Sequence, residues 1–206
     1  MRIFVVILFF FYSLHLFAEL PSGSTTISGD VSLTTDDQTL TIQQQSDQAI
    51  IEWNSFNIGE NNTVTFNQPA AAASALNRVI SGNPTTLAGV LNANGKVFVV
   101  NENGVYFTPT ATINAHSFAA STLALSNDDF LNNKLLFKLD DVDKIFSSIV
   151  HKGSITTLDG GFTALLGGAV DNEGTINANL GKIGIGAGKE ITLSLIHISE
   201  PTRRRT

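Results

Sequence analysis

Two consecutive segments of 21 residues, HKGSITTLDGGFTALLGGAVD (151–171) and NEGTINANLGKIGIGAGKEIT (172–192), carry the same pattern of glycines and apolar residues. Their alignment superposes Gly153 on Gly174, Ile155 on Ile176 and Phe162 on Ile183. A repeat of about 20 residues is typical of leucine-rich repeats and of parallel β-helices. Neither copy contains the leucine-rich consensus, and short apolar runs separated by Gly, Asn and Asp favour the β-helix.

A single coil of this kind is not stable alone. Ordering it costs on the order of 30 kcal/mol, whereas each buried aliphatic side chain returns only about 1.5–3 kcal/mol. Stacked coils share apolar rows, one of Ile155 with Ile176 and one of Phe162 with Ile183, and join through a parallel ladder. We therefore predict an all-β protein, a right-handed single-stranded parallel β-helix with an amino-terminal cap and extra-helical β elements.

The upstream sequence predicts longer and less repetitive strands. They are expected at Val31–Leu33, Leu40–Ile42, Ala49–Trp53, Thr63–Phe66, Val97–Val100 and Val105–Phe107. Trp53 and Phe56 are predicted to anchor the core or the cap. Two stretches are predicted to leave the coil: Gln68–Gly89, with a short helical turn over Ala70–Leu76, and Asp128–Lys144.

Both ends of the chain differ from this pattern. Residues 1–18 place Arg2 before an apolar run from Ile3 to Phe17, which is typical of a secretory signal peptide, with an uncleaved anchor as the alternative. Residues 193–206 break the glycine pattern and read as a non-native, adapter-derived tail, with a genuine basic tail as the alternative. The expected domain is therefore residues 19–192, truncated at its carboxyl end.

Composition excludes several classes of function. Residues 19–192 contain 8 Lys and Arg against 17 Asp and Glu, a net charge of −9. Phosphate backbones need a basic face, so nucleic acid is not an expected partner. The chain has no Cys, which excludes disulfides, thiol nucleophiles and Cys-bound zinc.

Polysaccharide-binding or polysaccharide-cleaving β-helices are the alternative class. Cleavage needs paired carboxylates or a calcium-bound acidic cluster with a base. The candidate groups are Asp36-Asp37, Asp128-Asp129, Asp140-Asp141 with Asp143, and the histidines His116 and His151. Adjacent carboxylates on a strand point to opposite faces, and these lie in polar turns, so we interpret them as solvated. No enzyme activity, cofactor or metal site is expected.

Five blocks of the sequence occur in an order that resembles a known family. They are AIIEWNSFNIG (49–59), LNRV (76–79), GVLNANGKVF (89–98), NENGV (101–105) and AASTL (119–123). Across Leu20–Thr192 the chain resembles the amino-terminal secretion domain of filamentous-haemagglutinin-type large exoproteins, closest to the high-molecular-weight adhesin branch.

This resemblance implies two-partner secretion in a Gram-negative bacterium. The partner would be a cognate outer-membrane β-barrel transporter with periplasmic modules, and the exoprotein would be secreted through the periplasm to the cell surface. Host or bacterial cell-surface receptors would bind the missing carboxy-terminal region, and the domain would be monomeric. The residues assigned to transporter recognition are Asn77, Arg78, Val79, Asn101, Asn103, Gly104 and Val105.

The residues themselves leave two alternatives open. The family motif Asn-Pro-Asn-Gly-Ile is replaced here by Glu102 and Val105 at two positions, and the loss of Pro removes a fixed φ angle. Asn103-Gly104 is equally typical of a tight turn that has only a structural role. Arg78, the only arginine of residues 19–192, is suited to bracing loops through its planar fork as well as to contacting a partner.

Overall fold

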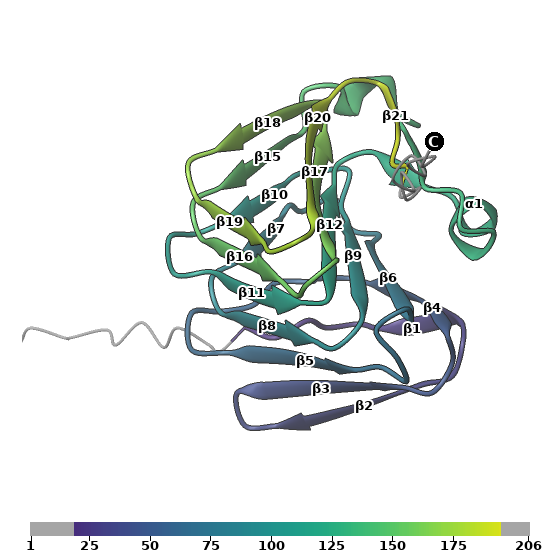
Figure 1. Ribbon diagram of the computed structural model, residues 1–206, viewed down its shortest axis with the longest axis vertical. Coiled ribbons are helices and arrows are strands. Elements are labelled where there is room, and N and C mark those ends of the chain that lie inside the picture. The colour runs from purple at the N-terminus through teal and green to yellow at the C-terminus, as the bar shows by residue number, and fades with distance from the viewer. Residues whose placement is uncertain (1–18, 195–206) are drawn as a thin grey trace, which may run out of the picture.

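The computed structural model describes residues 19–194, and in this part the chain winds into stacked parallel coils (Figure 1). The predicted signal segment and residues 195–206 of the predicted tail lie outside the described residues. Each regular coil contributes one strand to each of three sheets. The fold class predicted from the repeat is confirmed.

Within each sheet, the strands of successive coils pair in parallel. The first sheet has the order β1 (Thr25–Ser28), β4 (Gln48–Trp53), β6 (Ser74–Val79), β9 (Lys96–Val100), β12 (Ser117–Ser121), β17 (Phe162–Gly167) and β20 (Lys182–Ala187). The second has β19 (Thr175–Ala178), β16 (Ser154–Thr157), β11 (Thr112–Ala115), β8 (Val90–Ala93), β5 (Thr63–Asn67), β3 (Thr39–Gln44) and β2 (Val31–Asp36). The third has β18 (Ala169–Asn172), β15 (Ser148–His151), β10 (Val105–Phe107) and β7 (Thr85–Leu87).

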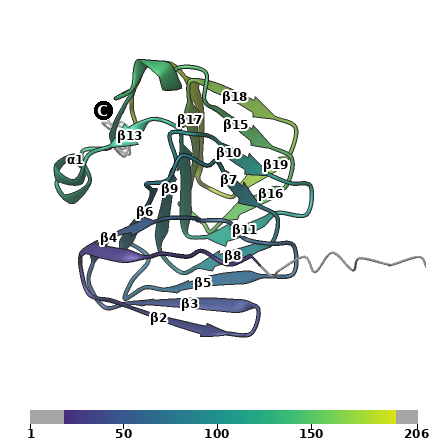
Figure 2. The same cartoon turned by 180° about the vertical axis from the view of Figure 1, so that it is seen from behind.

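The amino-terminal end of the solenoid is capped by two antiparallel strands. Strand β1 pairs with β4, and β2 pairs with β3, at the purple end of the ribbon in Figures 1 and 2. Because each covers the edge of a first-coil strand, the parallel ladder begins on a protected edge. Strand β2 is itself an edge strand, since β3 is its sole partner among the described strands.

A second group of elements lies outside the coils. An outer sheet of antiparallel strands joins β13 (Ala124–Leu125), β14 (Leu136–Lys138) and β21 (Glu190–Thr192). Helix α1 (Asn127–Leu131) and a 3-10 turn (Val142–Lys144) complete this excursion. Figures 1 and 2 show α1 on the side of the first sheet that faces away from the other two sheets. The predicted departure of Asp128–Lys144 from the coil is therefore confirmed.

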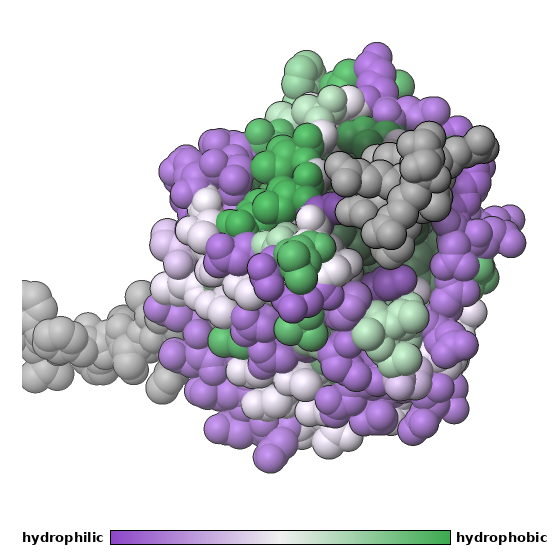
Figure 3. Space-filling view, viewed as in Figure 1, coloured by the Kyte–Doolittle hydropathy of each residue, from purple (hydrophilic) through white to green (hydrophobic). Residues whose placement is uncertain are grey.

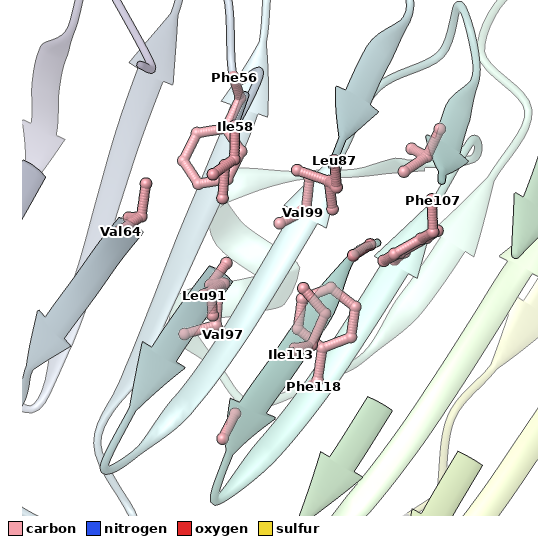
Figure 4. Packing of buried hydrophobic residues seen from close by; sticks show 14 of the residues in the cluster. Phe56, Ile58, Val64, Leu87, Leu91, Val97, Val99, Phe107, Ile113 and Phe118 are labelled. Atoms are coloured by element: carbon pink, nitrogen blue, oxygen red, sulfur yellow. The ribbon is translucent and has the colours of Figure 1, made fainter. Parts of the chain in front are cut away.

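Apolar residues cover both faces of the first sheet. In β9, Val97 and Val99 point into the solenoid and belong to the interior cluster shown in Figure 4, whereas Phe98 and Val100 belong to a second cluster beneath α1 and the outer sheet. A strand that is buried on both faces needs a continuous apolar run rather than alternation. The excursion thus covers the outer face of this sheet and buries its apolar side chains.

Four of the predicted core residues, Trp53, Phe56, Ile155 and Ile176, are buried or partly buried. Trp53 and Phe56 are buried and form an edge-to-face ring pair with centroids 5.3 Å apart. Ile155 is buried in the interior cluster and stacks in register on the partly buried Ile176.

The predicted row of Phe162 with Ile183 is wrong. The observed register places Phe162 opposite Lys182 and Thr163 opposite Ile183. Four residues join β16 to β17, but three join β19 to β20, so the second copy is one residue shorter there. A one-residue difference exchanges the faces of a strand. Phe162 therefore lies in the outer cluster.

The prediction that Ile183 is a core residue is also wrong. Ile183 is 51% exposed and Ile185 is 49% exposed, although their register with Thr163 and Leu165 turns them toward the solenoid interior. No further coil covers them among the described residues. Figure 3 shows the resulting green apolar area over β18–β20.

The predicted helical turn at Ala70–Leu76 is absent. Ser74–Val79 forms strand β6 of the first sheet, preceded by a turn in which Ala73 N donates to Ala70 O over 3.0 Å. Pairing with β4 and β9 on both sides outweighs the local helix preference of an alanine run. Gln68–Gly89 consequently supplies coil strands β6 and β7 rather than a separate excursion.

Candidate functional site

The Asn101–Val105 turn is held by its first asparagine. Asn101 is fully buried, and its Nδ2 donates to Asn83 O (3.0 Å) and to Thr85 Oγ1 (2.9 Å). Its Oδ1 accepts from Asn103 N over 2.9 Å, which closes an Asx turn. Each polar atom of the Asn101 side chain therefore has a partner within the protein.

The second half of the turn requires both Asn103 and glycine. Asn103 Nδ2 donates to Ser81 O over 2.7 Å, and its Oδ1 accepts from Lys144 Nζ of the excursion. Gly104 has φ +122°, which is unfavourable for residues with a Cβ. Val105 is buried at the start of β10. The turn thus connects a neighbouring loop to the excursion.

Glu102 occupies the position that holds proline in the family motif. Burial raises the pKa of its carboxyl group, and the nearby Asp140 and Asp141 raise it further, whereas Lys144 and Arg78 act in the opposite direction. The Glu102 side chain remains partly accessible. Where the family motif has proline, this chain therefore has an ionisable carboxyl group in the site.

The LNRV segment divides between the core and the outer face. Asn77 is fully buried: it accepts from Trp53 Nε1 over 3.0 Å and donates from Nδ2 to Phe98 O over 3.2 Å. Val79 is buried in the interior cluster. These two residues consequently stabilise β6 and offer no side-chain surface to a partner.

Arg78 points to the outer face and joins three elements. Its Nη1 lies 3.2 Å from Glu52 Oε1 on β4, and its Nη2 donates to Leu125 O and to Asn127 Oδ1, both over 2.7 Å. Leu125 ends β13 and Asn127 begins α1. The guanidinium thus attaches the excursion to the first sheet, which is the bracing role considered from the sequence.

Arg78 and Glu102 meet at one hollow of about 410 Å³. Asp128 and Asp140 also line it, from the start of α1 and from the segment before the 3-10 turn. The two assigned segments therefore come together, but only Arg78, Glu102 and Asn103 reach accessible surface. Asn77, Val79, Asn101, Gly104 and Val105 lie in the core or in the turn's backbone frame.

Sequence reasoning missed the excursion's contribution to this site. Lys144 and Asn127 contact the assigned residues directly, yet they lie 41 and 49 positions away from Asn103 and Arg78. The ion pair of Arg78 with Glu52 could have been predicted from the sequence once β4 and β6 were paired, because the two residues are cross-strand neighbours. An acidic run that ends in a single lysine, Asp140–Lys144, was the other available signal.

Of the candidate catalytic groups, Asp128 and Asp140 line the hollow beside Arg78 and Glu102, and the histidines do not. Asp36 ends β2 and Asp37 follows it in the β2–β3 connection, and both are exposed, as are Asp140 and Asp141. His151 is buried against Phe107 with Nδ1 2.6 Å from Asn172 Oδ1, and burial lowers its pKa. Within residues 19–194 no group of three His, Asp or Glu side chains is arranged to hold a metal ion.

In the same range, residues 19–194, no helix meets the length and hydropathy needed to cross a bilayer.

The described residues form a capped parallel solenoid with an excursion fastened by Arg78 and Asn103. Residues 18–205 match the family described as TPS secretion domain, and the chain belongs to this family. The match extends beyond Thr192, so the domain boundary at that residue stays a prediction. The family acts in two-partner secretion with a cognate outer-membrane transporter.

Similar proteins come from Haemophilus influenzae. The chain is 38% identical over 183 residues to a heme/hemopexin-binding protein of strain Rd, covering 86% of this chain and 20% of the relative. A second heme/hemopexin-binding protein is 42% identical over 121 residues, 58% of this chain and 13% of the relative. The chain thus spans about a fifth or less of the length of these relatives.

A solved structure supports the same assignment. The crystal structure of the HMW1 secretion domain from Haemophilus influenzae superposes with a TM-score of 0.80 and 38% identity, over 84% of this chain and 46% of that chain. The chain is accordingly an amino-terminal secretion-recognition domain of a two-partner-secreted protein, a non-enzymatic type of domain. Proteins of this family are secreted through their outer-membrane transporter.

Proposed function

We propose that the periplasmic modules of the transporter recognise the surface around Glu102, Asn103 and Arg78. One observation carries this proposal: the accessible parts of both assigned segments converge on one hollow together with the excursion. Asn101 and Gly104 act indirectly, because they fix the shape of the turn. Asn77 and Val79 act through the stability of β6.

The proposed route begins with the signal segment at residues 1–18 and passes through the periplasm of a Gram-negative bacterium to the cell surface. The chain crosses unfolded, and the lack of Cys favours this passage because no disulfide forms there. Outside the cell, the capped first coils nucleate folding and each later coil stacks on the previous one. Edge strand β2 offers unpaired backbone groups for β-augmentation by the transporter.

The proposal also assigns different roles to the secretion domain and to the rest of the exoprotein. Host or bacterial receptors bind the region that follows the secretion domain, where a role in virulence would also reside. The secretion domain itself is monomeric and has neither a nucleic-acid partner nor catalytic activity. The acidic composition supports the absence of a nucleic-acid partner.

The test compares secretion of the full-length exoprotein into the medium for Asn103→Ala and Asn101→Ala. Asn103→Ala removes the contacts with Ser81 and Lys144 at the surface, and we expect secretion to fall severalfold with a loss of only about 0.5–1.5 kcal/mol in the free energy of unfolding of the purified protein. Asn101→Ala leaves the buried Thr85 hydroxyl and the partly buried Asn83 carbonyl without this donor, so stability and secretion should fall together.

Glu102→Pro is the matched control for turn geometry. It restores the family residue, and Pro favours the second position of such a turn. Stability is expected to rise by about 0.4–1 kcal/mol. Secretion is retained if the transporter reads the shape of the turn at this position, and it falls if the transporter contacts the Glu102 carboxylate. Normal secretion of Asn103→Ala would contradict the proposed recognition surface.

A further inference from the structure

The side chain of Lys144 ends at the side-chain amide of Asn103. Its Nζ donates to Asn103 Oδ1, whereas other lysines of the described part, such as Lys134 and Lys152, bind a carboxylate. The carbonyl carbon of an amide lies about 1.2 Å from its oxygen, so a small shift brings the lysine nitrogen to Asn103 Cγ. Lysine nitrogen is a nucleophile toward carbonyl carbon once it has lost a proton. The two side chains are therefore placed for a covalent reaction.

The backbone around Lys144 fixes this approach. Lys144 ends the 3-10 turn, and the side chain of Asp141 caps that turn by accepting from Asp143 N over 2.9 Å. Lys144 N donates to Asp141 O over 3.0 Å. Three residues later, Ser147 O accepts from Thr122 Oγ1 over 3.1 Å, which ties the segment to the end of β12. Groups that folding has already oriented react faster than groups that must first be brought together.

The amide of Asn103 is held from its other side. Its Nδ2 donates to Ser81 O over 2.7 Å and to Asn101 Oδ1 over 3.2 Å. The competing nucleophile in an Asn-Gly pair is the glycine nitrogen, whose attack on the same carbon gives a succinimide. Gly104 N donates to Asn101 O over 3.1 Å and is thus engaged in the turn. The fixed amide therefore faces the lysine as its available nucleophile.

A carboxyl group stands beside the pair. Glu102 precedes Asn103 in the turn. Burial, and then repulsion by Asp140, raise the pKa of the Glu102 carboxyl group, although attraction to Lys144 acts in the opposite direction. This attraction places the lysine charge near the carboxylate. A carboxylate with a raised pKa accepts a proton from an ammonium group more readily than an ordinary one does.

We propose that Lys144 and Asn103 form an intramolecular isopeptide bond after the chain has folded. Glu102 accepts a proton from the Lys144 ammonium group, and the neutral Nζ attacks Asn103 Cγ. The Nζ–Cγ bond forms, the Cγ–Nδ2 bond breaks, and the proton on Glu102 passes to Nδ2, which leaves as ammonia. Nζ gives a second proton to the Glu102 carboxylate, and the departing ammonia carries that proton away as ammonium. The reaction transfers no electrons to or from the protein and needs no other reagent.

The bond closes residues 103–144 into a covalent loop that includes β11, β12 and α1. A closed loop cannot be drawn out as a single extended chain, so on the proposed route it opposes return through the transporter. The stability changes given above for Asn103→Ala and Glu102→Pro are those of unreacted protein. In protein that carries the bond, both variants lack this link and should lose more stability than the parent's hydrogen bonds alone provide.

Mass spectrometry of the purified chain, kept folded at neutral pH, tests the proposal. We expect the loss of one ammonia molecule per chain. Trypsin should release peptide 97–134 joined to peptide 139–152, because a modified Lys144 is no longer cleaved. Mass is measured on purified protein, independently of secretion, so the bond and the recognition surface are tested separately.

Three variants define the reacting groups. Lys144→Arg keeps a positive donor but cannot lose its proton, so it should retain the ammonia and give no joined peptides. Glu102→Gln should slow the reaction at least about tenfold, as expected for loss of a proton-transfer group. The matched control, Lys138→Arg on β14, should react as the parent does.

An unchanged mass in the folded parent would overturn the proposal, and this measurement does not depend on the folding of any variant. The same loss of ammonia from Lys144→Arg would also overturn it, since that result indicates a succinimide at an Asn-Gly pair. Equal rates for the parent and Glu102→Gln would overturn the role of Glu102 in the proton transfer.

Discussion

The two ends of the solenoid are built differently. At the amino-terminal end, β1 and β2 cover the first coil, and Trp53 lies buried with its indole bonded to Asn77. At the other end, Ile183 and Ile185 face the interior but are half exposed. Because each coil is stabilised by its neighbours, a residue's contribution depends on whether a coil covers it as much as on its side chain.

The largest expected effect is at the capped end. Trp53→Ala removes a buried ring, ends its contact with Phe56 and leaves Asn77 Oδ1 without its donor. We expect a loss of about 3–5 kcal/mol in the free energy of unfolding, measured by urea denaturation. Trp53→Phe keeps most of the volume and should lose clearly less. Similar losses for both would show that the cavity is not the main cause.

Arg78→Ala should have an intermediate effect, concentrated in the excursion. It leaves Leu125 O and Asn127 Oδ1 without their donor, at a cost of about 1–3 kcal/mol. Amide hydrogen exchange should accelerate in residues 123–138 more than in β4 or β9. Arg78→Lys cannot restore all three contacts and should recover only part of the protection. Uniform acceleration across the solenoid would contradict a local bracing role.

Acidification should weaken the coil that contains His151. Burial lowers the pKa of its imidazole below the ordinary 6.5, so the unfolded chain takes up a proton before the folded protein does. The stability contributed by neutral His151 is present above pH 6.5 and is lost as the pH falls below that value. The loss is at most about 1.4 kcal/mol at pH 5.5. His151→Gln should lack this component when unfolding is compared at pH 7.5 and pH 5.5. An identical pH dependence in the variant would refute the assignment.

The smallest effect is expected at the uncovered end. Ile185→Ala removes methyl groups that are already half hydrated, so the loss should not exceed about 1 kcal/mol. Leu165→Ala, one strand earlier in the same register, is the matched control and should cost about 2–5 kcal/mol. Equal losses would mean that the last coil is as well packed as its predecessor.

The repeat in residues 151–192 was sufficient to predict the coil, because glycines and aliphatic residues recur where turns and inward positions must lie. It did not reveal the register of β20, since a connection shorter by one residue exchanges inward and outward positions. Alanine-rich residues 70–76 were misassigned because pairing on both sides of β6 is a long-range property. The polar contacts of Asn77 and Arg78 likewise depend on residues distant in sequence, such as Phe98 and Asn127.

Strand β20 carries glycine at 184 and 186 on the side opposite its isoleucines, and Ile191 and Leu193 lie over that bare strip. A Cβ at Gly186 would stand 3.1 Å from Ile191 Cδ1, so this close approach depends on glycine. From there β21 reaches back to β14, more than fifty residues earlier in the chain. The outer sheet over the excursion can therefore be completed only after the chain of β20 has emerged, so the excursion stays without this third strand until that point.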